Sequence, residues 1–528
     1  MQPHTAPTFR ERSLKRLGVL SLCVSLALPW NTLQAQGVNN RLPNLGDGAE
    51  VPLSVERRLG ESIAREIYRD PDYVDDAVLR DYVQSLWQPL LAAARQRGEL
   101  TPELDQQFAW DVALIRDRSI NAFALPGGYL GVHLGLIAAV NSGDELASVL
   151  AHELSHVTQR HIARMMAQQG RQGPMMMGAM ILGMLAAARA PNANSINAAN
   201  AVMVGGQAAS IQSQLNFSRD MEREADRVGY GVMTDAGFEA QGFVTMFEKL
   251  QQAARLNDNG SYPYLRSHPM TTERIADAQA RQQLMPKRPP VSTTPLHAMM
   301  AARAQVLTNP GVDALRNIVS VANSNLAAQP KARQAGLLYG AALASLKQRH
   351  WPAARQHMAQ LQNMSGLDAA ALRVVRLLAA EVSLTAGDVT QALSTLEAKP
   401  WSQTDRAARL QLAQTRLAQQ KPEQSKSVVN DMVAWVSQNP RDASAWLLLS
   451  QAYEQQGDAL RSIRAQAESR AVELDYVAAI DRFKAAQNLA QRLDREGKLD
   501  RAGHIEASVI DARLRALEQL RREETLQR

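Results

Sequence analysis

The chain has 528 residues, of which 45% are hydrophobic and 21% are charged, and its formal net charge is +6. This length can supply cores for two or more domains, and the single cysteine, Cys23, excludes a fold held together by disulfides. The cationic excess is mild and no basic patch is interleaved with aromatic residues, which argues against nucleic acid as a partner.

Residues 1–35 are typical of a secretory signal peptide. An apolar run over 17–30 ends shortly before Ala35, a small residue at the expected cleavage point. The run is short for a membrane span, which takes about 20 apolar residues. Cleavage would remove four cationic side chains and one acidic side chain and leave a formal charge of +3. We therefore expect an exported protein. The cationic start consists of Arg10, Arg12, Lys15 and Arg16.

Residues 121–132 predict two short strands joined by a turn. Pro126 has no N–H to give to a ladder, so it fits a sheet edge or a turn. An edge strand near a catalytic site can hold an extended peptide by adding it to the sheet. The alternative is an ordinary surface hairpin. The candidate substrate-binding positions are Asn121, Ala122, Phe123 and Ala124.

A His-Glu-x-x-His motif is formed by His152, Glu153 and His156. Ser142 and Glu145 form a capping box, which predicts the start of the helix that carries it. Histidines four residues apart share one helix face, so both imidazoles can reach a single ion at about 2 Å. Glu153 can then take the proton of a zinc-bound water. The motif therefore predicts a zinc hydrolase core.

The apolar run over 174–188 follows this helix. It is shorter than a membrane span. Its interpretations are a buried core helix, a methionine-rich lid over a substrate groove, and a segment that touches a bilayer surface.

A catalytic zinc needs a third protein ligand, and the segment from Ser218 to the turn at Gly237 predicts a helix that offers one. Glu222 and Asp226 share a face, so one can bind zinc while the other holds a ligand histidine. Glu224 is expected on roughly the opposite side, facing solvent. The alternative is a solvated charged face with no ligand in it.

Three motifs in this order resemble the HtpX-like and CAAX-prenyl-protease clan of zinc metallopeptidases. They are Asn-Ala-Phe-Ala-Leu-Pro-Gly-Gly (121–128), the His-Glu-x-x-His helix, and Ser-Arg-x-x-Glu-x-x-Ala-Asp (218–226). Within that clan the chain is similar to the periplasmic β-barrel assembly-enhancing protease family. The resemblance implies one Zn²⁺ per chain. Its implied site residues are the ligands His152, His156 and Glu222, the general base Glu153, and Asp226 as a supporting catalytic-site residue.

The same resemblance implies that the substrates are misassembled outer-membrane β-barrel proteins and that the β-barrel assembly machinery is a partner. The alternative function is a chaperone or assembly factor that acts through its repeats while proteolysis stays latent. Peripheral membrane contact through 174–188 is a further expectation, since the clan's membrane-embedded members carry transmembrane helices there.

His268 precedes Pro269, which places it at a helix boundary or in a loop, where it can swing into a site. The residues alone leave open a fourth zinc ligand that imposes latency, an oxyanion stabiliser, and a packing role. The family resemblance favours the site. His133 is interpreted as structural, and His161 as a brace for its helix.

The chain is predicted to be mainly α-helical. Residues 50–285 are expected to form the metallopeptidase domain with a small β-sheet, and 286–294 a proline-rich linker. Residues 295–528 fit helix pairs of the tetratricopeptide type, most clearly around Trp446, with a generic helical bundle as the alternative. Such an array has a concave surface suited to peptides or partner proteins.

Overall fold

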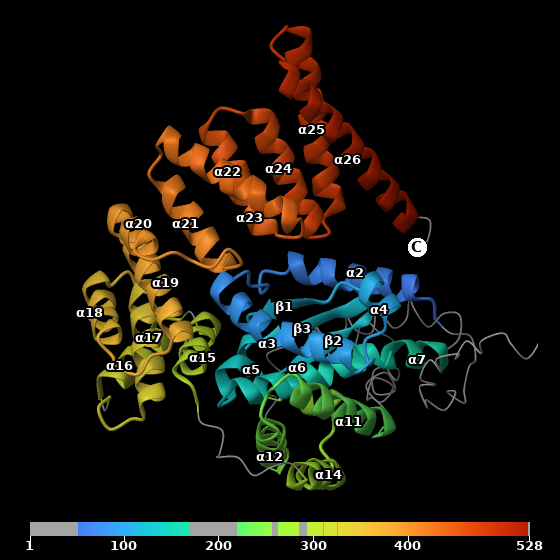
Figure 1. The fold of residues 1–528 in the computed structure, drawn as a ribbon, viewed down its shortest axis with the longest axis vertical. Coiled ribbons are helices and arrows are strands. Elements are labelled where there is room, and N and C mark those ends of the chain that lie inside the picture. Colours follow the sequence, from blue (N-terminus) through green and yellow to red (C-terminus); the bar gives the residue numbers. More distant parts are fainter. Residues whose placement is uncertain are drawn as a thin grey trace, which may run out of the picture. The chain divides into compact units, whose positions relative to one another are not determined.

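The computed structural model describes residues 51–168, 219–255, 262–284, 293–309, 311–324 and 326–525 (Figure 1). The predicted signal peptide at 1–35, the apolar segment at 174–188 and most of the linker at 286–294 lie outside these ranges. None of the helices within them is both long and apolar enough to cross a membrane.

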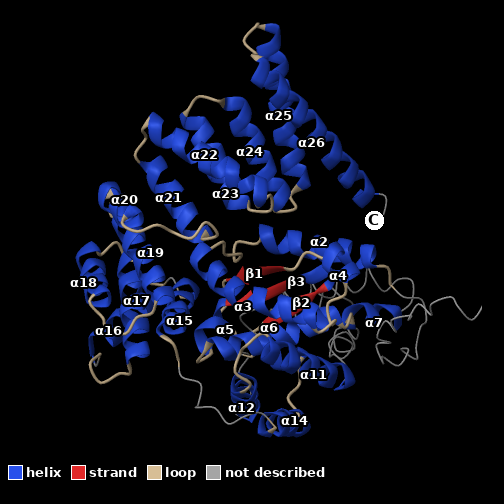
Figure 2. Cartoon of the chain, in the orientation of Figure 1, coloured by secondary structure: helices blue, strands red, loops and turns tan. Residues whose placement is uncertain are grey.

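A small sheet contains β1 (Asp111–Ile115), β2 (Ala122–Leu125) and β3 (Tyr129–His133) in the order β1-β3-β2 (Figure 2). β3 pairs in parallel with β1 and antiparallel with β2. The turn between β2 and β3 is η1 (Pro126–Gly128), where Gly127 has φ 72° and Gly128 has φ 81°, a region that suits glycine. The two predicted strands are therefore confirmed, and β2 is an edge strand in the described sheet.

The helix that carries the His-Glu-x-x-His motif is α6 (Gly143–Thr158), and it is buried from Glu145 to its end. The Ser142 Oγ accepts a hydrogen bond from the Glu145 N–H at 3.1 Å, as the capping box predicts. Glu145 reaches back to the N–H of Asn141 at 2.7 Å and also pairs with Lys249 at 2.8 Å. A helix buried on all sides belongs to a core, and α6 forms the centre of this one.

The other helices of this part surround the sheet and α6 (Figure 2). α11 and α12 pack directly on α6, and so does β2. The bounds are α2 (Leu53–Arg69), α3 (Ala77–Gln96), α4 (Pro102–Gln107), α5 (Leu134–Ala139), α7 (His161–Gln168), α11 (Arg219–Asp235), α12 (Gln241–Arg255), α13 (Tyr264–Ser267) and α14 (Thr272–Gln283). The helix predicted to end at the Gly237 turn is thus confirmed as α11.

From Pro295 onward the described chain is helical; α15 packs on α17, and from α16 onward each helix packs against the next. This confirms the mainly α prediction, while the tetratricopeptide type of the pairs stays a prediction. The bounds are α15 (Pro295–Thr308), α16 (Val312–Ser324), α17 (Lys331–Lys347), α18 (Trp351–Gln362), α19 (Ala369–Thr385), α20 (Val389–Glu397), α21 (Arg406–Ala418), α22 (Pro422–Gln438), α23 (Ala443–Gln455), α24 (Ala459–Val472), α25 (Tyr476–Arg495) and α26 (Arg501–Thr525).

Glu50–Arg528 form one compact unit. One cluster of buried apolar residues runs from Val74 to Ala408, and α15 packs on both α3 and α5. The residues assigned to the peptidase and to the helical array therefore share a core, and the domain boundary at 286–294 stays a prediction.

Candidate metal centre

Four buried side chains from α6, α11 and the end of α13 meet at one place. His152, His156, Glu222 and His268 each offer a ligand atom, and these atoms all lie within 4.8 Å of one another. Each of the four residues is at most 2% exposed. The structure therefore brings together the three ligands predicted from the sequence and the histidine whose role was left open.

The arrangement fits a bound cation. The Nε2 atoms of His152 and His156 face each other at 3.0 Å, and each lies 3.5 Å from an oxygen of Glu222. If both rings carry their protons on Nδ1, the two Nε2 lone pairs face the same point, and one metal ion between them would accept both. Two imidazoles and a carboxylate are a donor set that zinc takes in hydrolases. The chemistry of these residues thus fits zinc.

His268 completes the cluster. Its Nδ1 lies 3.0 Å from the Glu222 Oε1 and 3.3 Å from the His152 Nε2. The residue is the C-cap of α13, as its predicted place at a helix boundary requires, and its ring stacks on Tyr264 with centroids 4.5 Å apart. Its role as a ligand or as an oxyanion stabiliser stays a prediction.

Glu153 lies beside the cluster and is 0% exposed. The nearest cationic partner of its carboxylate is His268, whose Nε2 lies 3.5 Å from the Glu153 Oε1. Burial raises the pKa of Glu153, against the opposing effect of His268 and His152. A carboxylate with a raised pKa is suited to hold a proton between two steps of a reaction.

The charges around the cluster favour a cation. Burial alone would lower the pKa of His152, but Asp226 and Glu222 raise it to about 9. Burial and the neighbouring His152 hold the pKa of His156 well below its usual value. The pKa of Glu222 is also well below its usual value, because His268 and His152 outweigh the effect of burial. Glu222 therefore stays ionised in the metal-free protein.

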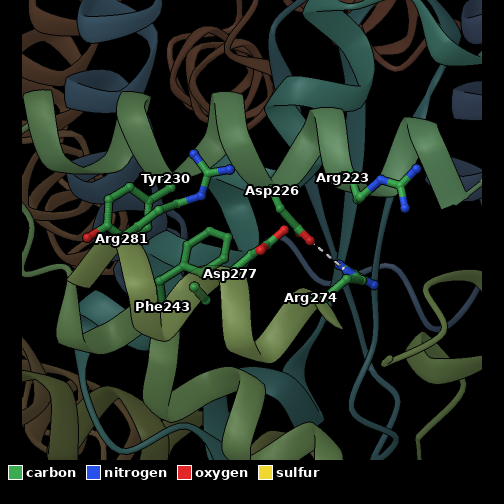
Figure 3. A pocket seen from close by; sticks show the side chains of 8 residues that line it. Arg223, Asp226, Tyr230, Phe243, Arg274, Asp277 and Arg281 are labelled. Atoms are coloured by element: carbon green, nitrogen blue, oxygen red, sulfur yellow. Dashed lines mark hydrogen bonds and ion pairs between the residues drawn. The ribbon is translucent and has the colours of Figure 1, made fainter. Parts of the chain in front are cut away.

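Asp226 contacts the cluster residue His152, and Arg274 in turn pairs with Asp226 (Figure 3). The Asp226 Oδ1 lies 3.0 Å from the His152 Nδ1. Arg274 donates from Nε and Nη2 to the two oxygens of Asp226 at 2.6 and 2.8 Å, and its Nη1 lies 2.8 Å from the Glu222 Oε2. A small pocket beside this pair is lined by further charged and aromatic side chains, among them Arg223, Tyr230, Phe243, Asp277 and Arg281.

Sequence reasoning did not assign a role to Arg274. A signal was present, because Asp226 and Glu222 were both expected near the metal, and buried carboxylates need cationic partners. The arginine follows the His268-Pro269 pair closely in the chain, at the start of α14.

Glu224 was expected to face solvent, but its side chain is only 29% exposed and it contacts other residues. Its Oε2 lies 3.1 Å from the His161 Nε2 and accepts a hydrogen bond from Arg164 at 2.7 Å. Arg160 adopts φ 54° between α6 and α7, and this turn precedes His161 at the start of α7. His161 was expected to brace its own helix, yet its ring contacts the predicted ligand His156.

The predicted substrate-binding residues lie on the edge of the sheet that α6 contacts. Ala122, Phe123 and Ala124 pair with β3, and the Asn121 carbonyl accepts a hydrogen bond from the His133 N–H at 3.0 Å. β2 therefore pairs on one side only in the described sheet. Its role in holding a peptide stays a prediction.

Comparison with known proteins agrees with this site. Residues 82–282 match Peptidase family M48. The chain is 36% identical over 296 residues to a putative β-barrel assembly-enhancing protease of Vibrio cholerae, a match that covers 56% of this chain and 57% of that relative. It is 28% identical over 514 residues to the β-barrel assembly-enhancing protease of Escherichia coli, over 96% and 98% of the two chains. It is 28% identical over 236 residues to a mitochondrial metalloendopeptidase of Schizosaccharomyces pombe, a match that covers 43% of this chain and 60% of that relative. The family resemblance predicted from the sequence is confirmed.

Proposed function

We propose that this chain, whose residues 82–282 match Peptidase family M48, is an exported zinc endopeptidase of the bacterial envelope. The observation that carries the proposal is the convergence of His152, His156 and Glu222 beside the buried carboxylate of Glu153. These are the parts that peptide hydrolysis by a zinc enzyme requires.

When bound by His152, His156 and Glu222, zinc would polarise the scissile carbonyl and acidify a water. Glu153 accepts the proton of the attacking water and, once protonated, donates it to the leaving amine. The Asp226 carboxylate, 3.0 Å from the His152 Nδ1, favours a proton on that nitrogen, which leaves the Nε2 lone pair directed at the cluster. Arg274 keeps Asp226 in place and ionised.

The peptide substrate is proposed to bind along β2. Asn121, Ala122, Phe123 and Ala124 belong to this edge, and α6 packs against the strand. An extended peptide that adds to a free edge gains main-chain hydrogen bonds that do not depend on its sequence. This mode suits an enzyme whose clients are unfolded or misassembled proteins.

The names of the relatives support a role in the assembly of β-barrel proteins in the envelope. More specifically, we propose export through the signal peptide at 1–35, a periplasmic location and degradation of misassembled outer-membrane proteins. The helical part over 295–528 would bind the client or the β-barrel assembly machinery. Contact of 174–188 with the membrane surface belongs to the same proposal.

A second function is favoured by the closed state of the centre. Glu153 and the four clustered residues are almost fully buried, and His268 lies against both Glu222 and Glu153. A protein with its catalytic residues enclosed in this way can act as a chaperone or assembly factor while proteolysis is latent. We therefore keep a chaperone role as the alternative.

Metal analysis tests the proposed zinc site. The purified protein is expected to hold one zinc per chain, and the double variant His152→Ala/His156→Ala is expected to lose it, because two of its three protein ligands are gone. His504→Ala is the control, since His504 is 58% exposed and belongs to α26. Zinc that stays at full stoichiometry in the double variant would disprove the site.

His268→Ala tests latency. If His268 occupies the open coordination position, its removal should raise cleavage of an unfolded protein about tenfold or more, as expected when a minor competent state becomes the main one. Zinc should stay bound through the other ligands. A fall in cleavage of about 10²–10³-fold would instead assign His268 to oxyanion stabilisation. Initial rates and zinc content, measured together, separate the two roles.

A further inference from the structure

We propose that His161 and Glu224 are positioning residues for the zinc ligand His156, joined to it by a hydrogen-bonded relay. This inference rests on the proposed zinc site. It concerns the second histidine of the motif, for which family resemblance and sequence spacing gave no supporting partner.

The relay is continuous in the structure. The Nδ1 of His161 lies 2.9 Å from the Nδ1 of His156, and the two rings meet edge-on with centroids 4.9 Å apart. The Nε2 of His161 lies 3.1 Å from the Glu224 Oε2. His156 and His161 are 1% and 0% exposed, so bulk water does not compete for these bonds.

The order of donors and acceptors follows from the ligand role of His156. Its Nε2 faces the metal cluster and must offer a lone pair, so the proton of the neutral ring is on Nδ1. That N–H donates to the Nδ1 of His161. His161 then carries its own proton on Nε2 and donates it to the ionised Glu224. One arrangement of protons therefore satisfies every polar atom of the two rings.

The same helix supports both ligand histidines in parallel ways. α11 supplies Glu222 to the metal cluster, Asp226 to His152, and Glu224 to the relay. Asp226 is backed by Arg274, and Glu224 is backed by Arg164 at 2.7 Å. Asp226 contacts His152 directly, whereas Glu224 projects from a different face of α11. Its link to His156 therefore runs through His161. Partners that orient metal-bound histidines in this way raise metal affinity.

Two substitutions at 161 separate hydrogen bonding from packing. In His161→Gln the amide oxygen can accept from His156 and the amide N–H can donate to Glu224, which preserves the order of the relay. In His161→Leu a side chain of similar bulk fills the space without either bond. Zinc dissociation constants are measured by chelator competition, together with the absorption spectrum of the Co²⁺ form and the urea midpoint of the metal-free protein.

We expect His161→Leu to raise the zinc dissociation constant about 10–100-fold, the usual effect of losing such a partner, and to change the Co²⁺ spectrum. His161→Gln should keep a zinc dissociation constant and a Co²⁺ spectrum close to those of the wild type. The matched control is His297→Leu, another buried histidine, held by Tyr82 at 2.6 Å and by the Val140 carbonyl at 2.9 Å. It should lower the urea midpoint without changing zinc affinity.

Glu224→Leu provides a second variant should His161→Leu fold poorly, since Glu224 is 29% exposed and its loss leaves the core intact. Glu224→Leu should also raise the zinc dissociation constant, but by less than His161→Leu does. The double variant His161→Leu/Glu224→Leu should bind zinc no more weakly than His161→Leu alone, because both changes break the same relay. Wild-type zinc affinity in His161→Leu, or equal loss in the Gln and Leu variants, would overturn the relay. A wild-type protein without zinc would overturn the zinc site itself, and the relay with it.

Discussion

Glu153→Gln is expected to lower peptide cleavage by about 10²–10⁴-fold, the range attributed to a general acid–base residue, while zinc stays bound at one per chain. Glutamine keeps the shape of the side chain but has no carboxylate to accept a proton. Glu153 lies outside the group of residues whose ligand atoms converge, so its replacement removes no proposed zinc ligand. Initial rates on casein and zinc content of the same preparation measure both effects, in the His268→Ala background if the wild type is latent.

Glu145→Gln is a matched control for this experiment. Glu145 is a buried glutamate of the same helix, but its carboxylate pairs with Lys249 and caps the start of α6. Its replacement should lower stability and leave cleavage measurable. Cleavage by Glu153→Gln at the wild-type rate would contradict the assigned mechanism. A Glu153→Gln protein that supports β-barrel assembly as well as the wild type would favour the chaperone role over proteolysis.

The parts of the site that sequence could predict are those set within a single helix. His152 and His156 share a face of α6 because helical geometry fixes the relation of residues four apart, and Glu222 and Asp226 share a face of α11 for the same reason. Ser142 likewise marks the start of α6 through a local hydrogen bond. Spacing along one element was sufficient for each of these.

The missed residues depend on how separate elements meet. Glu224 projects away from Glu222 on α11, and periodicity alone assigns such a position to solvent. The placement of His161 on α7, after the turn at Arg160, provides a buried partner for it. Arg274 similarly reaches two carboxylates of α11 from the start of α14. The pattern of one helix does not show which groups its neighbours present.

The helical part gives a further example. The pair α19 and α20 turns at Gly387 and the pair α23 and α24 turns at Gly457, and both glycines adopt positive φ. The pair α21 and α22 turns instead at Gln420, which adopts φ 54° without being a glycine. Glycine is favoured in this conformation but is not required, so a search guided by glycine misses such a turn.

Arg303 joins the helical part to the peptidase part. It belongs to α15 and is 5% exposed. Its Nε and Nη2 donate to the oxygens of Asp76 at 2.9 and 2.8 Å, and its Nη1 donates to Glu381 at 3.0 Å and to the Tyr339 hydroxyl at 3.2 Å. Burial alone would raise the pKa of Asp76, but the Arg303 guanidinium holds that pKa below its usual value. Asp76 also caps α3, because it accepts a hydrogen bond from the Leu79 N–H.

Arg303→Met should therefore lower the free energy of unfolding by about 3–5 kcal/mol, the usual effect of leaving one partner of a buried ion pair uncompensated. Urea unfolding measures this, with Arg316→Met as the control, since Arg316 is 71% exposed and its loss should change stability by less than about 0.5 kcal/mol. Equal stability of the two variants would contradict the prediction. Adding Asp76→Asn should restore part of the loss, because the stranded charge is then removed. Because Asp76 both caps a helix of the peptidase part and binds an arginine of the helical part, and because the two parts share a core, the wild type and Arg303→Met should both unfold in one transition, which makes their free energies of unfolding comparable.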